Sequence, residues 1–305
     1  MKPLSKIWMD GKFVNWDDAK IHVLTHGLHY GTAIFEGMRC YDTKNGPAVF
    51  RMKDHYHRLF RGAKAYEFKI NYSQNHLISV TKELIRKNKV KSCYIRPICY
   101  IGYSSIGINM LDKPFHLSII PVDFAKYFGK KAELGISCTI SSWRRISANI
   151  LSPHVKASAN YLNSALAKVD AINGGYDEAI MLSQDGHVSE GTGENVFVYR
   201  DGELVTPPLY DGVLAGLTRD SVIQIAIDLG IPIRERSILR DELYTADEMF
   251  LCGTAAEITP VLSVDKRQIG DGKKPGEITN RIRKRFFDIV SGKDERFVKW
   301  LDFVD

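Results

Sequence analysis

The sequence predicts a two-domain α/β protein, with a smaller sheet-and-helix domain first and a larger domain second. Three observations lead to this prediction. The chain has 305 residues, 44% of them hydrophobic and 26% charged, which is an ordinary globular composition and enough for two moderate domains. Strand-like and helix-like patterns occur in both halves. The stretch from Asp123 to Glu133 lies between the two sets of patterns, so we predict domains over residues 1–123 and 134–305, joined by residues 124–133.

Composition narrows the classes of function. The net charge is +6, but Lys and Arg residues are interspersed with Asp and Glu, so there is no nucleic-acid signature. The five cysteines are far apart and form no Cys-x-x-Cys pair, which favours reduced thiols in a cytoplasmic protein. No apolar run approaches the length of a membrane span, and residues 1–8 lack a signal-peptide pattern. We therefore expect a cytoplasmic protein without nucleic-acid or membrane partners.

Three histidines, His22, His26 and His29, have a spacing that metal ligands on a helix can share. No acidic residue or cysteine accompanies them in that stretch. Packing or hydrogen-bonding roles are therefore favoured, and we predict no metal site.

The first half is predicted to begin with sheet and to continue with two helices. Asp10-Gly11 suits a tight hairpin turn, and β-branched and aromatic residues favour strands on both sides of it. The predicted strands are two within Lys6 to Val14, then Ile21 to His29, Thr32 to Tyr41, Ala48 to Arg51, Ser92 to Tyr103 and Pro114 to Val122, and the predicted helices are Met52 to Tyr66 and Ser73 to Lys89.

Two arginines of this half allow more than one interpretation. Arg58 falls on the polar side of its helix, and by itself it is a surface residue that can pair with Asp54. Arg96 stands inside a strand among apolar and aromatic residues, and a charge buried there needs an anionic partner. That partner is either a structural carboxylate or the carboxylate of a substrate.

The second half alternates short strands with three helices. The helix after Lys156 carries an apolar stripe and is closed by Gly174-Gly175. Asp201-Gly202 predicts a second hairpin turn. The predicted strands are Leu134 to Ser142, Glu178 to Ser183, Asn195 to Arg200, Glu203 to Thr206 and Glu248 to Leu251, and the other predicted helices are Arg219 to Leu229 and Glu277 to Val290. The last of these helices is predicted to have an apolar face of Ile278, Ile282, Phe286 and Ile289.

Lys156 is the residue around which we expect the chain to be organised. A single lysine before a helix is ordinarily a solvated surface group. Here the small residues Ala157, Ser158 and Ala159 leave room beside the amine, and the other neighbours are mostly apolar or small. A lysine in desolvated surroundings becomes a nucleophile that can form a Schiff base. Lys156 is therefore a candidate nucleophile.

Three further segments are candidate binding loops. Residues 189–195 contain two glycines, but the third glycine and the following helix of a dinucleotide-binding loop are missing, so a Rossmann fold is rejected. Thr218 either caps the helix that follows or belongs to a phosphate site at its amino terminus. Thr254 and Glu257 have capping-box spacing, so the same two interpretations compete there.

Taken together, these segments resemble the class IV pyridoxal-phosphate aminotransferases of fold type IV, and most closely the branched-chain amino-acid aminotransferases. The resemblance spans nearly the whole chain. Its most specific part is the signature Glu190-Gly-Thr-Gly-Glu194-Asn195-Val-Phe197, which continues to Leu214-Ala-Gly-Leu217-Thr218-Arg219. The segments that resemble the branched-chain group in particular are residues 29–32, 35–39, 94–97 and 253–260.

The resemblance implies that pyridoxal 5'-phosphate is the cofactor and that Lys156 is the catalytic residue, holding the cofactor as a Schiff base and then acting as general base and acid. Glu190 would face the pyridine nitrogen, where a carboxylate keeps the nitrogen protonated so that the ring accepts electrons. Tyr161 would face the phenolic oxygen, and Arg58 would bind the phosphate together with helix-terminal amides. The implied cofactor-binding residues are Arg58, Lys156, Tyr161, Glu190, Glu194, Asn195, Leu217, Thr218, Gly253 and Thr254.

The implied reaction is reversible transfer of the amino group from L-leucine, L-isoleucine or L-valine to 2-oxoglutarate. One pocket must then accept both an apolar side chain and the γ-carboxylate of glutamate, and in the family an aromatic wall with one cation, here Arg96, serves both. Tyr94 with the amides of Thr254 and Ala255 would hold the α-carboxylate, while Arg39 and the loop near Gly107 would help to close the site. The implied substrate-binding residues are Tyr30, Phe35, Gly37, Arg39, Tyr94, Arg96, Tyr127, Thr254 and Ala255.

The resemblance also implies self-association, because relatives are homodimers or larger homo-oligomers whose active sites borrow residues from a neighbouring subunit. We therefore expect at least a dimer. Two departures from the family pattern affect only the expected substrate preference: Ser158-Ala159 stands where many relatives have two glycines, and Phe124 stands where the family has a tryptophan.

Two alternative functions remain at this point. The first shares the fold: a D-amino-acid aminotransferase or an aminodeoxychorismate lyase, against which the segments 94–97 and 253–260 argue. The second is a catalytically silent phosphate-binding protein on the same scaffold. The expected mark of that protein is the loss of Lys156 or Glu190, and both are present.

Overall fold

The computed structural model describes residues 2–124 and 127–305, and these form two compact units. Residues 2–124, 155–159 and 288–305 belong to unit 1, and residues 127–154 and 160–287 belong to unit 2. Residues 125 and 126 of the expected connection lie outside the described residues. Two short segments from the second half of the chain, 155–159 and 288–305, thus lie in unit 1, and one of them contains Lys156.

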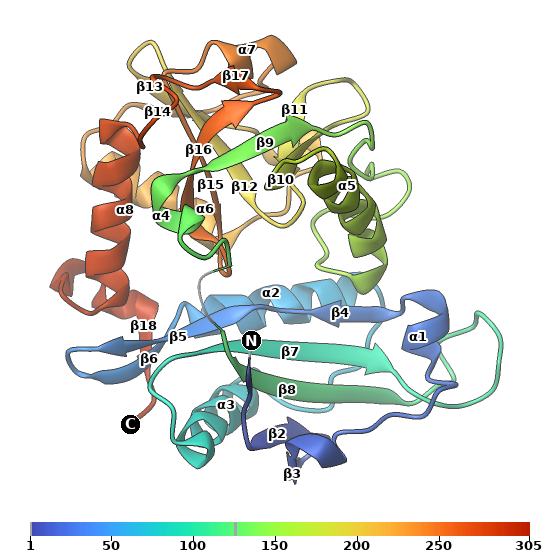
Figure 1. Cartoon of the computed structure of the whole chain (residues 1–305). Coiled ribbons are helices and arrows are strands. Elements are labelled where there is room, and N and C mark those ends of the chain that lie inside the picture. Colours follow the sequence, from blue (N-terminus) through green and yellow to red (C-terminus); the bar gives the residue numbers. More distant parts are fainter. Residues whose placement is uncertain (1, 125–126) are drawn as a thin grey trace. The chain divides into compact units, whose positions relative to one another are not determined.

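Unit 1 is built on an antiparallel sheet in which nine strands of the described chain pair (Figure 1). The main path runs β18-β6-β5-β7-β8-β2-β3, with β1 on β8 and β4 on β7. The hairpin predicted at Asp10-Gly11 is confirmed, because β2 and β3 pair across it. The strands are β1 (Lys2–Pro3), β2 (Lys6–Met9), β3 (Lys12–Asn15), β4 (Ala33–Phe35), β5 (Met38–Thr43), β6 (Gly46–Phe50), β7 (Cys93–Ile101), β8 (Phe115–Asp123) and β18 (Leu301–Phe303).

The helices α2 (Met52–Ala65) and α3 (Gln74–Asn88) confirm the two helices predicted in the first half. They pack against each other and against the sheet. Ser73 caps α3 by accepting a hydrogen bond from the amide of His76. The core of unit 1 lies between these helices and the sheet, and it includes Trp8, Tyr56 and Leu84. Short 3₁₀ segments, η1 (Trp16–Asp18) and η4 (Glu295–Trp300), complete the unit.

The strand predicted over Ile21 to His29 is wrong. This segment contains the helix α1 (His26–Tyr30), which ends at Gly31 in a left-handed conformation. The His26 ring is hydrogen-bonded to Thr32 Oγ1 at 2.7 Å and to the carbonyl oxygen of Gly107 at 2.9 Å. Because these contacts come from other parts of the fold, they override the local preference of β-branched residues for strands.

Unit 2 contains a second sheet, again with nine strands of the described chain. The strand β11 pairs with both β10 and β12, so the path of pairing closes on itself, and β13 and β14 extend it beyond β12. The hairpin predicted at Asp201-Gly202 is confirmed by the pairing of β12 with β13. The strands are β9 (Ile136–Ile140), β10 (Glu178–Leu182), β11 (Val188–Gly191), β12 (Asn195–Arg200), β13 (Glu203–Thr206), β14 (Ile233–Glu235), β15 (Glu248–Gly253), β16 (Glu257–Val264) and β17 (Arg267–Gln268).

The three predicted helices of the second half are confirmed by α5, α6 and α8. On α8 the predicted apolar face is buried, with Ile282, Phe286 and Ile289 at its centre. The remaining helical segments were not predicted. The helices are α4 (Lys131–Leu134), α5 (Tyr161–Asn173), α6 (Leu217–Asp228), α7 (Arg240–Tyr244) and α8 (Glu277–Val290), and the 3₁₀ segments are η2 (Ser158–Asn160) and η3 (Leu209–Asp211).

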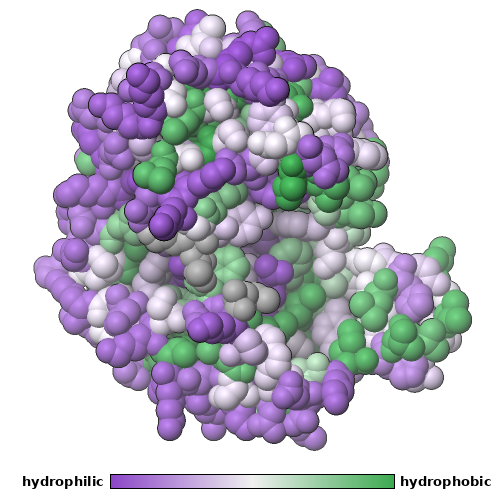
Figure 2. All heavy atoms as spheres, viewed as in Figure 1, coloured by the Kyte–Doolittle hydropathy of each residue, from purple (hydrophilic) through white to green (hydrophobic). Residues whose placement is uncertain are grey.

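The helix α5 buries the opposite face from its apolar stripe. The residues of the stripe, hereafter the α5 stripe, are Leu162, Leu166, Val169 and Ile172, and all of them are exposed. The buried positions are Ser164, Ala167 and Ala171. Small side chains let the helix backbone approach the sheet closely, so the face with small residues packs against the sheet. Figure 2 shows hydrophobic residues gathered on the surface over α5.

No helix is formed after Thr254, so the capping-box interpretation of Thr254 and Glu257 is wrong. These residues lie at the turn between β15 and β16, and Glu257 has a φ of 54°. The pairing of β15 with β16 keeps the chain extended on both sides of the turn. In the part of the chain that the structure describes, no helix is both long and apolar enough to cross a membrane.

Candidate active site

Lys156 lies on a short segment whose backbone contacts β4. The amide of Phe35 donates to the carbonyl oxygen of Lys156 at 2.9 Å, and Ala157 forms an antiparallel bridge with Ile34. The neighbours Val155 and Ala157 are buried in the core of unit 1, whereas Lys156 itself is only partly buried. The Ala157 amide also donates to the Val155 carbonyl oxygen at 2.8 Å, which makes a tight turn at Lys156. Lys156 Nζ lies 5.0 Å from the centroid of the Phe35 ring.

Arg96 approaches the same aromatic ring from β7. Its Cζ lies 4.6 Å from the centroid of Phe35 and 5.2 Å from that of Tyr94, and its Nη2 donates to the Tyr94 hydroxyl at 2.8 Å. Its Nε is buried and has no hydrogen-bond partner among the described residues. A guanidinium with an unused buried donor suits an anionic ligand. The structure thus brings together Lys156, Phe35, Tyr94 and Arg96.

Gly37 belongs to the same group because of a close approach. A Cβ atom at residue 37 would collide with the hydroxyl of Tyr94. Any other residue at this position would therefore displace the hydroxyl to which Arg96 donates. This steric requirement explains why glycine stands here.

Arg58 is held by a buried carboxylate. Glu36 accepts hydrogen bonds from Arg58 Nε at 2.6 Å and from Arg58 Nη2 at 2.9 Å, which is a bidentate pair. His55 Nδ1 lies 2.7 Å from the second carboxylate oxygen. The pair fixes the guanidinium plane of Arg58, so Arg58 is not merely the surface residue that its place on the helix suggested.

The charges of this group shift the pKa values of Glu36 and His55. Burial alone would raise the pKa of Glu36, but the charges of Arg58 and His55 and their hydrogen bonds outweigh it and hold that pKa well below 4.5. Burial lowers the pKa of His55, and the charges of Arg58 and Lys156 lower it further, against the opposing effect of Glu36. At neutral pH Glu36 is therefore ionised.

In unit 2, Glu190 on β11 is surrounded by donors. Its Oε1 lies 2.8 Å from Arg145 Nη2. Its Oε2 accepts from the Leu214 amide at 2.9 Å and from Asn195 Nδ2 at 3.4 Å. Asn195 in turn donates to the Leu214 carbonyl oxygen at 3.1 Å. These contacts hold the Glu190 carboxylate in one orientation.

The same network leads to the amino terminus of α6. A Cβ atom at Gly216 would collide with Asn195 Oδ1, so only glycine allows this contact. Gly216 is the N-cap of α6 and makes no side-chain capping bond. Thr218 lies one residue inside the helix and is buried, so it is not the cap that one sequence interpretation proposed. Helix amino termini attract anions.

Glu194 and Glu178 form a buried acidic cluster near this network. Burial first, and then the charge of Glu178, raise the pKa of Glu194 to about 8. Glu178 is compensated by Lys168 Nζ at 2.7 Å and accepts from Thr192 Oγ1 at 2.7 Å. At neutral pH Glu194 therefore carries a proton, and Glu178 is paired with a cation.

The other residues implied by the sequence have these positions. A Cβ atom at Gly253 would lie 3.3 Å from the Gly193 carbonyl oxygen, so the strand β15 ends close to the 189–195 segment. The half-exposed Tyr30 ring contacts His26, and Arg39 Cζ lies 5.6 Å from the Tyr41 ring. Tyr127 is exposed and packs on Phe128 at 4.7 Å. Tyr161 is the first residue of α5, Leu217 is the first of α6, and Thr254 and Ala255 lie in the β15–β16 turn.

Sequence reasoning assigned no role to Glu36, His55 or Arg145. Glu36 follows the apolar run Ala33-Ile34-Phe35, and a carboxylate there is a signal of a buried ion pair. Arg145 gave no such signal, because it follows another arginine in a stretch without clear periodicity.

The three amino-terminal histidines serve as hydrogen-bonding residues, as predicted. His26 bonds Thr32 and Gly107, His29 Nε2 lies 2.9 Å from the Val23 carbonyl oxygen, and His22 Nδ1 accepts from the Leu24 amide. Across residues 2–124 and 127–305, no group of three or more histidine, cysteine or acidic side chains is arranged to hold a metal ion.

The chain is similar in sequence and in fold to known proteins. The chain is 44% identical to the branched-chain-amino-acid aminotransferase of Escherichia coli (strain K12) over 307 residues, which covers 100% of this chain and 99% of that protein. It superimposes on a crystal structure of the E. coli branched-chain amino acid aminotransferase with a TM-score of 0.97 at 44% identity, covering 99% of this chain and 100% of that one. It also matches the branched-chain amino acid aminotransferase from Thermobaculum terrenum in its PLP-bound holo-form, with a TM-score of 0.93 at 34% identity and 100% coverage of both chains.

The sequence model of the amino-transferase class IV family matches residues 33–264. This range contains most of the residues described above, from Phe35 through Lys156 and Glu190 to Thr254. The expected resemblance and fold are thereby confirmed. The chain belongs to the amino-transferase class IV family.

Proposed function

We propose that this chain catalyses the reversible transfer of an amino group between L-leucine, L-isoleucine or L-valine and 2-oxoglutarate, with pyridoxal 5'-phosphate as cofactor. The observation that carries the proposal is the contact of Lys156 and Arg96 with one aromatic ring, that of Phe35. A reactive amine, an apolar wall and a carboxylate-binding cation are the three groups that such a reaction requires. Full-length similarity to branched-chain-amino-acid aminotransferases supports the same function.

The residues present fit pyridoxal 5'-phosphate, and we propose that they hold this cofactor. The bound cofactor supplies a pyridine ring that accepts electrons from the substrate. The triply contacted carboxylate of Glu190 suits a protonated pyridine nitrogen. The amino terminus of α6, with Leu217 and Thr218, suits the phosphate, as does the fixed guanidinium of Arg58. Tyr161, Glu194, Asn195, Gly253 and Thr254 complete the proposed set.

The chain's own residues then divide the work of the reaction. Lys156 Nζ removes the proton from the substrate α-carbon, and its backbone pairing with Phe35 holds the amine in place. Tyr94 with the amides of Thr254 and Ala255 binds the α-carboxylate. Phe35, with Tyr30 and Tyr127, packs on an apolar side chain, and Arg39 helps to close the site. Gly37 leaves the space that the Tyr94 hydroxyl needs.

Arg96 is proposed to bind the γ-carboxylate of 2-oxoglutarate or glutamate. We expect Arg96→Ala to raise KM for 2-oxoglutarate about 10- to 100-fold, as befits the loss of a charge-assisted hydrogen bond, and to change KM for L-leucine by less than about threefold. Steady-state kinetics with each substrate varied in turn measure both values. Arg61→Ala, on an exposed arginine of α2, is the control. Equal losses for both substrates would remove the assigned role.

The visible absorption spectrum of the purified protein tests the proposed function itself. A yellow band of lysine-bound cofactor should be present and should collapse when L-leucine is added without any oxo acid. A band that ignores L-leucine but responds to D-alanine would favour the D-amino-acid alternative, and turnover of aminodeoxychorismate would favour the lyase. No band after incubation with pyridoxal phosphate would indicate a silent scaffold.

We further propose that the chain associates with copies of itself as a dimer or larger oligomer. Two apolar surfaces support this proposal. One is the α5 stripe. The other, the loop surface, lies on α1 and the β7–β8 loop, where Figure 2 shows hydrophobic residues gathered. It consists of Val23, Leu28, Tyr103, Ile106, Ile108 and Leu111, all exposed. Beside it, a cavity of about 590 Å³ is lined by apolar residues that include Leu28 and Ile98. Surfaces of this kind mark interaction sites.

A charge on either surface should weaken the assembly. We expect Ile108→Glu and Val169→Glu each to shift the protein toward the monomer, because a buried carboxylate without a partner is costly. Size-exclusion chromatography with light scattering gives the mass. Ile227→Glu, on an exposed apolar residue of α6, serves as the control. A wild-type protein that is already monomeric at working concentration would contradict the proposal.

A cytoplasmic location is also proposed. All five cysteines are free thiols buried in the structure, as expected for a protein of a reducing compartment.

A further inference from the structure

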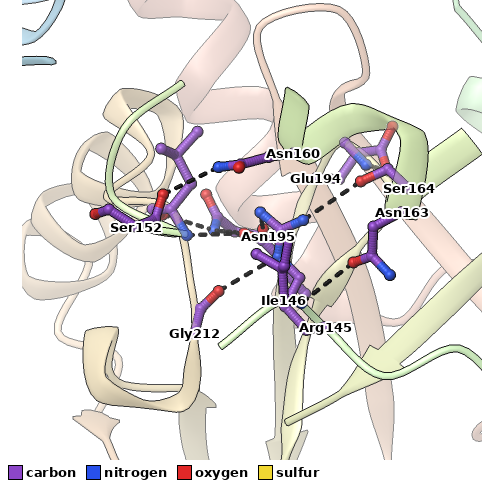
Figure 3. Close-up of polar contacts among 12 residues, drawn as sticks. Arg145, Ile146, Ser152, Asn160, Asn163, Ser164, Glu194, Asn195 and Gly212 are labelled. Carbon is purple, nitrogen blue, oxygen red and sulfur yellow. Dashed lines mark hydrogen bonds and ion pairs between the residues drawn. The ribbon is translucent and has the colours of Figure 1, made fainter. Parts of the chain in front are cut away.

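Arg145 and Glu190 form an ion pair that is almost fully removed from water. The side chains are 6% and 8% exposed, and Arg145 Nη2 lies 2.8 Å from Glu190 Oε1. Two further donors of Arg145, Nε and Nη1, reach the Gly212 carbonyl oxygen and Ser164 Oγ, both at 3.4 Å (Figure 3). The backbone of Arg145 is fixed as well, because its amide donates to the Leu182 carbonyl oxygen at 2.8 Å. The guanidinium therefore has one defined orientation.

Stability alone is a weak reason for such a pair. Removing two charges from water costs several kcal/mol per ion, and apolar residues of similar volume often serve stability as well or better. A buried pair whose carboxylate belongs to the signature segment of the family therefore calls for a role beyond packing. The effect of Arg145 on the orientation of the Glu190 carboxylate supplies one.

We propose that Arg145 is a positioning residue, which holds the Glu190 carboxylate in one place and orientation so that Glu190 can act as the partner of the pyridine nitrogen. This inference rests on the proposed function, in which Glu190 faces that nitrogen. Arg145 itself touches neither cofactor nor substrate in this proposal. Its effect passes through the carboxylate alone.

Arg145 holds one oxygen of the carboxylate, and neutral donors hold the other. Arg145 Nη2 contacts Glu190 Oε1, whereas Oε2 accepts from the Leu214 amide and from Asn195 Nδ2. Without Arg145, Oε1 would lose its ion pair, and the carboxylate would be fixed from one side only.

The neighbouring acids Glu194 and Glu178 are not equivalent to Glu190 as partners for the pyridine nitrogen. Glu194 is protonated at neutral pH, because burial raises its pKa to about 8, and Glu178 is paired with Lys168. The other groups that contact Glu190 are neutral, the Leu214 amide and the Asn195 side-chain amide. Within the described contacts of Glu190, Arg145 is thus the cationic one.

The test compares Arg145→Met and Arg145→Gln with the wild type on two cofactors. One is pyridoxal phosphate, and the other is its 1-deaza analogue, in which a carbon replaces the pyridine nitrogen. With pyridoxal phosphate, we expect each variant to lower kcat for L-leucine about 10- to 100-fold, with KM changed less than about threefold, as expected for a lost charge-assisted hydrogen bond. With the analogue, wild type and variants should be equal within about twofold, because the group that Glu190 serves is missing.

Cofactor affinity gives a second measurement that does not depend on turnover. Binding of each cofactor to cofactor-free protein is followed by fluorescence quenching. The variants should bind pyridoxal phosphate about tenfold more weakly than the wild type and the analogue equally well. Arg145→Lys, which retains the charge, should recover most of both losses. Arg144→Met is the matched control, because Arg144 is the exposed neighbour of Arg145.

Two outcomes would overturn the inference in distinguishable ways. If the variants lose as much with the analogue as with pyridoxal phosphate, Arg145 has only a structural role, although the proposed function stands. If neither the Arg145 variants nor Glu190→Gln change the rate or the affinity with pyridoxal phosphate, then Glu190 is not the partner of the pyridine nitrogen, and the proposed role of Glu190 itself is wrong. Two variants are used so that the result does not depend on the folding of a single one.

Discussion

Replacing Lys156 by alanine should lower the rate of amine transfer from L-leucine to 2-oxoglutarate by more than about 10⁴-fold. The side chain is proposed both to bond the cofactor and to move the α-proton, and proton transfer by a positioned group alone accounts for about 10² to 10⁴ in rate. The rate is measured by glutamate formation under single-turnover and steady-state conditions. Unchanged turnover in Lys156→Ala would remove the central claim.

The fold should survive this substitution. Val155 and Ala157 make the buried contacts of the segment, and the backbone bond from the Phe35 amide to the Lys156 carbonyl oxygen does not involve the side chain. Thermal unfolding of Lys156→Ala should therefore resemble that of Lys64→Ala, a substitution at an exposed lysine of α2 that should also leave activity intact. A small primary amine added to Lys156→Ala should restore part of the lost rate, because the missing group is an amine.

Replacing Glu36 by glutamine should lower the free energy of unfolding by about 3 to 5 kcal/mol, because it leaves the guanidinium of Arg58 without its charge partner in a buried position. Urea denaturation followed by tryptophan fluorescence measures the change. Glu83→Gln is the matched control, since Glu83 forms an exposed i,i+4 pair with Lys87. That pair should contribute less than about 0.5 kcal/mol. If Glu36→Gln lowers the free energy of unfolding no more than Glu83→Gln does, the buried pair contributes no more to stability than an exposed pair.

The contribution of Glu36 should also depend on pH in a defined direction. Its pKa in the folded protein lies well below the ordinary 4.5. Above pH 4.5 the contribution of Glu36 to stability is fully present. As the pH falls below that value, Glu36 becomes protonated in the unfolded chain but stays ionised in the folded protein, so stability is lost. The difference between the wild type and Glu36→Gln should therefore shrink on acidification from pH 5. A constant difference would refute this assignment.

Local sequence was sufficient for many of the elements and for part of the site. The turns at Asp10-Gly11 and Asp201-Gly202, the start of α3 near Ser73 and the apolar face of α8 each depend on residues within a few positions of one another. Lys156 was identified for a similar reason, because its small neighbours are adjacent in the chain. Preferences that act over one turn or one hairpin can be read from the chain alone.

Tertiary structure decided which face of a correctly predicted helix is buried and which charges meet. The sequence marked the α5 stripe as apolar, but the sheet accepts the face with Ser164, Ala167 and Ala171, and the stripe stays at the surface. The segment Ile21 to His29 has strand-like residues and yet forms α1, because His26 finds partners at Thr32 and at the distant Gly107.

The buried pairs Glu36 with Arg58 and Arg145 with Glu190 join residues that lie far apart in the sequence. The chain by itself determined its family, its main elements and the lysine that carries the proposed chemistry. Only the folded structure shows which charged partners, such as Glu36 and Arg145, surround that chemistry. The strength of an ion pair depends on the distance between its two groups and on their removal from water, and local sequence determines neither quantity.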